Sequence, residues 1–166
     1  SPINIYGKSK FAGEQAVLQR KNSLVLRTNF LCRSRSKGRL SLFDFFFNAI
    51  VNRQKISIFR DVLFSPISAS TLAQITLELA ISDLIGIYNV GARNGLSKAR
   101  VFALVSELLG IEETNAVVAD SRSIKTRTQR PLDLRMQVNA IEKVMGRRMP
   151  TVQQELKGII YATSNN

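Results

Sequence analysis

Short apolar runs alternate along this chain with longer segments of helical periodicity. Leu24–Leu26, Ile56–Phe59 and Ile87–Val90 have the length and the composition of β-strands. Leu24–Leu26 is apolar at every position, which is typical of a strand buried on both faces. Because strands alternate with helices rather than following one another, the sequence predicts an α/β fold.

The helical segments begin at capping residues and several of them end at glycine. Ser70 or a neighbour caps the third helix, Gly110 stops the fourth, and Thr151 and Gln154 form a capping box for the last, with a frayed tail after it. We expect helices over Tyr6–Arg20, Leu40–Val51, Ser70–Ile81, Ser97–Leu109, Ala140–Met145 and Thr151–Tyr161, and a further short strand at Val117–Ala119.

The composition excludes several kinds of site. The chain has 166 residues, 45% of them apolar, which is enough for the core of one ordinary domain. It has one cysteine and no histidine, so an internal disulfide and a Cys/His metal site are both excluded. No apolar run reaches the roughly 20 residues that span a bilayer. We therefore expect no membrane contact, no metal and a cytoplasmic location.

The net charge is +12, and its densest groups are Arg33–Arg39 and Arg122–Arg130. Such clusters are common on solvated surfaces, and they can also bind phosphorylated ligands. Charge alone supports nucleic acid only weakly as a partner.

Tyr6 and Lys10 are four residues apart on the first predicted helix, so they share a face about one turn apart. An ammonium beside a phenol favours the phenolate form, which would let Tyr6 exchange a proton with a substrate oxygen. Lys10 could also hold a ribose diol through its N–H donors. This spacing is common on helices, so the pair by itself is weak evidence for catalysis.

The wider sequence resembles the extended short-chain dehydrogenase/reductase family, and within it the dTDP-4-dehydrorhamnose reductase-like sugar-nucleotide reductases. The pair lies in Y-G-K-S-K-F-A-G-E, and the strand that follows ends in L-R-T. Further similar segments are D-V-L-F-S-P-I-S-A-S-T-L-A at 61–73, G-I-Y-N-V-G at 86–91 and R-P-L-D-L at 130–134. The resemblance covers residues 2 to about 157.

The resemblance implies the C-terminal part of a Rossmann-like doubly wound sheet with a small substrate-binding α/β region. Residues 1–35 would belong to the NAD(P)-binding part, and residues 36–166 mainly to the substrate-binding part, with segments returning to the sheet. In the family a glycine-rich cofactor segment and a catalytic Ser or Thr precede the Tyr–Lys pair, whereas none of the nine glycines here forms such a motif. We therefore expect a fragment or a truncated paralogue, inactive alone, with an exposed edge on Leu24–Leu26.

The resemblance also implies roles for single residues. Tyr6 would be the general acid, and Lys10 would activate it and bind the ribose of NADP or NAD. Thr28, Asn29 and Phe30 would border the cofactor, and Asn29 also the substrate, although Phe30 could instead belong to the core. A nucleotide-sugar substrate would further contact Ser65, Pro66, Arg130 and Asp133, with Lys125 and Arg127 adding positive charge.

Alternative functions stay open at this point. Ile67 stands where the family has a hydroxyl-bearing Thr, which leaves the sugar undefined. A nucleoside diphosphate sugar epimerase or dehydratase of the same superfamily would share these motifs. So would a non-catalytic reductase-like regulatory subunit, of the kind found with methionine adenosyltransferase. A homodimer is a further possibility.

Overall fold

The computed structural model describes residues 2–34, 40–112, 114–123 and 129–164, and it confirms an α/β fold with parallel strand pairs. The helices are α1 Ile5–Leu18, α2 Leu42–Val51, α3 Ala69–Ala80, α4 Lys98–Leu109, α5 Asn139–Met145 and α6 Val152–Ser164, with a 3-10 turn at Ser121–Ser123. The strands are β1 Leu24–Thr28, β2 Phe30–Leu31, β3 Ile56–Phe59, β4 Leu63–Phe64, β5 Ile67–Ser68, β6 Gly86–Val90, β7 Leu96–Ser97, β8 Ala116–Ala119 and β9 Asp133–Leu134.

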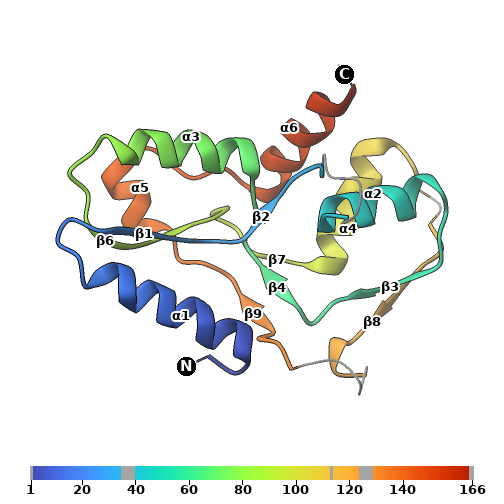
Figure 1. Cartoon of the computed structure of the whole chain (residues 1–166). Helices are drawn as coiled ribbons and strands as arrows, with labels where there is room; N and C mark the ends of the chain where they lie inside the picture. Colours follow the sequence, from blue (N-terminus) through green and yellow to red (C-terminus); the bar gives the residue numbers. More distant parts are fainter. Residues whose placement is uncertain (1, 35–39, 113, 124–128, 165–166) are drawn as a thin grey trace.

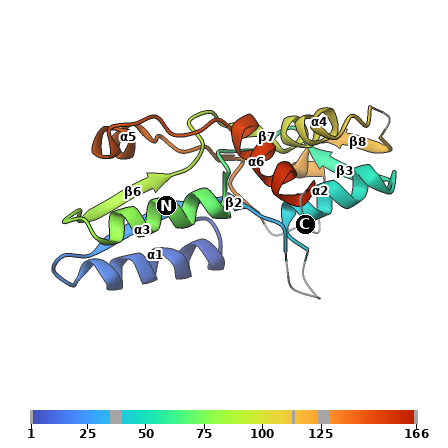
Figure 2. The same ribbon diagram turned by 90° about the horizontal axis from the view of Figure 1, so that it is seen from above.

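One half of the molecule is built on the parallel pair β1–β6 (Figure 1). Its register runs from Leu24 opposite Gly86 to Thr28 opposite Val90. Helix α3 lies over one face of this pair and α1 over the other, while α5 packs beside β6 (Figures 1 and 2). Leu24 and Leu26 contact a buried apolar cluster. The fully buried members of that cluster are Ile67, Ile75, Leu79, Val90, Val138, Ile141 and Met149.

The other half contains the parallel pair β3–β8 with α2 and α4 (Figure 1). Its core is aromatic, with the Phe46 and Phe102 rings in edge-to-face contact at 5.5 Å between centroids. Phe43 and Phe46 are buried here, whereas Phe45 is partly exposed. Helix α6 contributes Leu156 to this core and contacts both α4 and β5. The small sheet β7–β4–β9 lies between the two halves (Figure 1).

Most predicted elements are confirmed to within two residues, and the caps explain why. Ser97 caps α4, and Gly110 ends it in the left-handed conformation with φ 67°. The amide of Thr151 donates to Gln154 Oε1 while the amide of Gln154 donates to Thr151 Oγ1, which is the expected capping box. The N-cap of α3 is Ser68 rather than Ser70. Helix α6 continues through Ser164, so the tail prediction is wrong up to that residue.

The expectation that β1 is buried on both faces is wrong. None of its residues is fully buried, because only one face meets the apolar cluster under α3. On the other face α1 has no buried residue, and its apolar Phe11 and Val17 are exposed. Within the described part of the chain, β6 is the only strand that pairs with β1.

Candidate functional site

Tyr6 and Lys10 project from the same face of α1, as their spacing predicts. The Asn4 side chain caps the helix by accepting from the Gly7 amide at 2.8 Å, which fixes where its first turn begins. The Lys10 Nζ lies 5.6 Å from the centroid of the Tyr6 ring, and the Tyr6 side chain is 71% exposed. The phenol and the ammonium are therefore adjacent and open to a ligand.

An ion pair holds α1 against β1. Arg27 donates to both carboxylate oxygens of Glu14, at 2.7 and 2.5 Å. The bond to Arg27 lowers the pKa of the Glu14 carboxyl below its ordinary value. Since Arg27 directly precedes Thr28, this contact fixes α1 relative to the carboxyl end of β1.

Thr28 and Asn29 follow at that carboxyl end, which is where open α/β sheets bind their ligands. The Thr28 Oγ1 and Asn29 Oδ1 atoms are buried, and neither has a hydrogen-bond partner among the described residues. Buried polar atoms are normally paired, so this end of β1 has unused hydrogen-bonding capacity. Phe30 is 54% exposed, so the alternative that placed it in the core is wrong.

A segment formed by residues 129–137, here called the crossing segment, runs from α1 past the end of β1 to β6. Three asparagine side-chain amides donate to its carbonyls: Asn4 to Gln129 at 3.0 Å, Asn29 to Leu134 at 3.2 Å and Asn89 to Gln137 at 3.3 Å. These contacts bring together parts of the chain that are more than 100 residues apart in two of the three cases. Sequence reasoning missed Asn4 and Asn89. Their visible signal was an amide side chain, directly before α1 for Asn4 and one residue before the end of β6 for Asn89.

Ser65 and Pro66 lie beneath the crossing segment and are fully buried. The Ser65 Oγ accepts from the Met136 amide at 3.2 Å. The chain is also very close here to Gly91, where a Cβ would lie 2.6 Å from the Ser65 carbonyl oxygen. Ser65 therefore supports the crossing segment from a buried position.

Arg130 and Asp133 lie on the crossing segment and are exposed. The Asp133 carboxylate is engaged by Arg135, whose Nη2 donates to Oδ2 at 2.7 Å and whose Nε donates to Oδ1 at 3.0 Å. The hydrogen bonds from Arg135 lower the pKa of Asp133 to about 2. Lys125 and Arg127, the other expected cations, lie outside the described residues.

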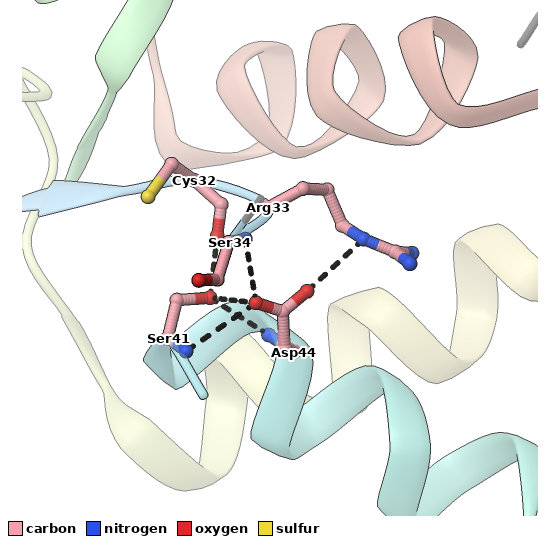
Figure 3. Close-up of polar contacts among 5 residues, drawn as sticks. All are labelled: Cys32, Arg33, Ser34, Ser41 and Asp44. Carbon is pink, nitrogen blue, oxygen red and sulfur yellow. Dashed lines mark hydrogen bonds and ion pairs between the residues drawn. The ribbon is translucent and has the colours of Figure 1, made fainter. Parts of the chain in front are cut away.

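Arg33, the first residue of the basic group 33–39, makes contacts that stabilise the fold (Figure 3). Arg33 Nε forms an ion pair with Asp44 at 3.0 Å, and its guanidinium lies over the Phe47 ring at 4.4 Å. Asp44 is buried and also accepts from the Ser34 amide and the Ser41 hydroxyl, both at 2.7 Å. Arg33 is therefore paired with the Asp44 carboxylate. Residues 35–39 lie outside the described part of the chain.

Two further observations concern the described residues alone. No group of three or more carboxylate, thiol or imidazole side chains is arranged to hold a metal ion there. No helix in that part has the length and apolar character needed to cross a membrane.

The parallel strand pairs and the helices that flank them define a protein of the Rossmann-like α/β class. Residues 1–165 match the family described as the RmlD substrate binding domain, and the chain belongs to this family.

Named relatives agree with this assignment. The chain is 25% identical over 171 residues to the probable low-salt glycan biosynthesis reductase Agl14 of Haloferax volcanii, covering 99% of this chain and 56% of the relative. It is 25% identical over 177 residues to the dTDP-4-dehydrorhamnose reductase of Sinorhizobium fredii, covering 97% and 57%. The chain thus spans a little more than half the length of these relatives.

The fold also matches solved structures. The dTDP-4-dehydrorhamnose reductase of Bacillus anthracis, solved in complex with NADP, superimposes with a TM-score of 0.83 at 24% identity. The match covers 98% of this chain and 56% of that one. At this identity the likeness establishes the fold.

Proposed function

We propose that this chain is the substrate-binding portion of an NADPH- or NADH-dependent sugar-nucleotide reductase, and that Tyr6 is its proton donor. The observation that carries the proposal is the Tyr6–Lys10 pair in the first turns of α1, with Nζ 5.6 Å from the centroid of an exposed ring. The reductase names of both curated relatives support the same reaction class.

The chemistry of the pair follows from its charges. A bound nicotinamide supplies the hydride that reduces a keto carbon of the sugar to an alcohol carbon. The keto oxygen then needs one proton, and the exposed Tyr6 hydroxyl can donate it. Lys10 stabilises the phenolate that remains, because it holds a positive charge one helical turn away. General acid assistance of this kind contributes roughly 10²- to 10⁴-fold to a rate.

The residues present fit the nicotinamide end of a dinucleotide. Lys10 can donate to a ribose diol, and the unpartnered Thr28 Oγ1 and Asn29 Oδ1 mark unused hydrogen-bonding capacity at the carboxyl end of β1. The printed sequence has no glycine-rich turn to cradle the pyrophosphate. We therefore propose that this chain is the C-terminal portion of a longer reductase. In that arrangement residues 1–35 complete the cofactor half, and residues 36–166 mainly form the substrate half.

The substrate proposed is a dTDP-linked 4-keto sugar, which is supported by the name of the Sinorhizobium relative. The crossing segment is the proposed nucleotide contact. Arg130 is exposed on it, and a guanidinium can donate two parallel bonds to phosphate oxygens.

A nucleoside diphosphate sugar epimerase or dehydratase is the second candidate. A solved dTDP-glucose 4,6-dehydratase shares the fold at a TM-score of 0.78. The two chemistries differ in cofactor balance, because a reductase consumes one reduced nicotinamide per product while an epimerase returns its cofactor unchanged.

The test is therefore stoichiometric. The longer protein that contains this chain is incubated with dTDP-4-dehydrorhamnose and NADPH or NADH, and product and oxidised cofactor are both counted. We expect one oxidised cofactor per reduced sugar. Sugar conversion without net oxidation would favour the second candidate. Binding of a stoichiometric protein partner with no turnover would favour a regulatory subunit.

A further inference from the structure

Arg135 is the one cation of the crossing segment that the resemblance did not assign. It is separated by a single peptide bond from Leu134, whose carbonyl accepts from the Asn29 amide. Its side chain is 52% exposed. Arg135 therefore lies at the rim of the proposed nucleotide site, and it can be reached from solvent.

Two neighbours fix the position of this side chain. Asp133 accepts from the Arg135 Nε, Nη2 and backbone amide, the last at 3.0 Å. Gly95 fixes the stem, because a Cβ at this position would lie 2.2 Å from Arg135 Cγ and 2.4 Å from Cδ. The aliphatic stem thus occupies room that only glycine leaves.

The guanidinium keeps donors free in this arrangement. It has five N–H donors, and Asp133 uses the one on Nε and one of the two on Nη2. The three remaining donors point away from the carboxylate. A planar group with free donors that is already held in one orientation loses little freedom when it binds an anion.

We propose that Arg135 binds a diphosphate oxygen of the nucleotide and that Asp133 and Gly95 position it. This inference rests on the proposed function and changes the expected role of Asp133. Both Asp133 oxygens accept from Arg135, so Asp133 orients a phosphate-binding guanidinium. Arg130 adds the net positive charge that the neutral Asp133–Arg135 pair lacks.

The test compares two probes, thymidine 5′-diphosphate and thymidine, titrated into the 166-residue chain by calorimetry. The variants are Arg135→Gln, Arg130→Gln and Gly95→Ala. Arg60→Gln is the matched control, since Arg60, directly after β3, forms a similar exposed two-bond pair with Asp120, directly after β8. Thermal unfolding of each variant is measured in parallel.

We expect Arg135→Gln to weaken thymidine diphosphate binding about tenfold, the size of one lost charge-assisted bond. Thymidine binding and the unfolding temperature should stay as in the wild type. Gly95→Ala should also weaken the binding of thymidine diphosphate, although it keeps every charge. Arg60→Gln should leave the binding of both probes and the unfolding temperature unchanged.

Three results would overturn the inference. If Arg130→Gln weakens binding but Arg135→Gln does not, the nucleotide site stands and the role of Arg135 is wrong. If Arg135→Gln weakens both probes equally and lowers the unfolding temperature, its role is structural. If the wild-type chain does not bind thymidine diphosphate, both the inference and the proposed substrate site fail.

Discussion

Glu155 is a buried carboxylate on α6 that supports the start of α3, and replacing it gives a sharp test of the packing. Its side chain accepts from the Ser68 amide at 2.6 Å and from the Thr71 hydroxyl at 3.0 Å. Glu155→Ala would remove the acceptor of the buried Ser68 amide and of the half-buried Thr71 hydroxyl. Each hydrogen bond to a charged group contributes about 1.5–3 kcal/mol, so the pair predicts a loss of about 3–6 kcal/mol.

That loss is a large share of the roughly 5–15 kcal/mol that stabilises a typical domain. Glu155→Gln keeps one oxygen that can accept from the Ser68 amide, so we expect it to lose only about 1–2 kcal/mol. Gln153→Ala, exposed on the same helix, is the control and should leave stability nearly unchanged. Urea unfolding followed by circular dichroism measures all three. The reasoning is refuted if Glu155→Ala lowers the free energy of unfolding by less than about 1 kcal/mol. It is also refuted if Glu155→Ala lowers it no more than Glu155→Gln does.

Three further predictions follow from single contacts. Gly91→Ala should destabilise the chain by about 1–3 kcal/mol in the same urea assay, because its Cβ would meet the Ser65 carbonyl. Gly13→Ala is the control and should not destabilise the chain, because a Cβ at Gly13 would meet open space. Equal losses of stability in the two variants would contradict the prediction. Burial raises the pKa of the Cys32 thiol, and the Asp44 carboxylate adds a smaller effect in the same direction. Alkylation of Cys32 at neutral pH should therefore be slower in the folded chain than in urea. Equal alkylation rates would contradict this prediction. The chain alone should show no NADPH binding by calorimetry, and tight binding would refute the proposed need for an additional cofactor half.

The fold was largely predictable because its elements begin and end at local signals. Ser97, Gly110 and the Thr151–Gln154 pair determine helix ends within a few residues of themselves, and such contacts are visible in sequence. The two-residue strands β2, β4, β5, β7 and β9 were missed, because each depends on a partner far along the chain rather than on its own apolar pattern.

The candidate site divides in the same way. The Tyr6–Lys10 proximity follows from helix geometry and was predicted. The ion pairs of Arg33 with Asp44 and of Arg135 with Asp133 were not predicted, because the residue pattern does not say which charge finds a partner. The lack of burial in α1 was also missed, since amphipathic spacing marks an apolar face without showing what covers it.

The most direct test of the central claim is the turnover of Tyr6→Phe in the longer protein that contains this chain, assayed with dTDP-4-dehydrorhamnose and reduced cofactor. Tyr161→Phe is the matched control, because it removes an exposed hydroxyl from α6 instead of from α1. We predict that Tyr6→Phe lowers kcat by roughly 10²- to 10⁴-fold with thymidine diphosphate affinity retained, while Tyr161→Phe turns over normally. Equal turnover of Tyr6→Phe and the wild type would contradict the account.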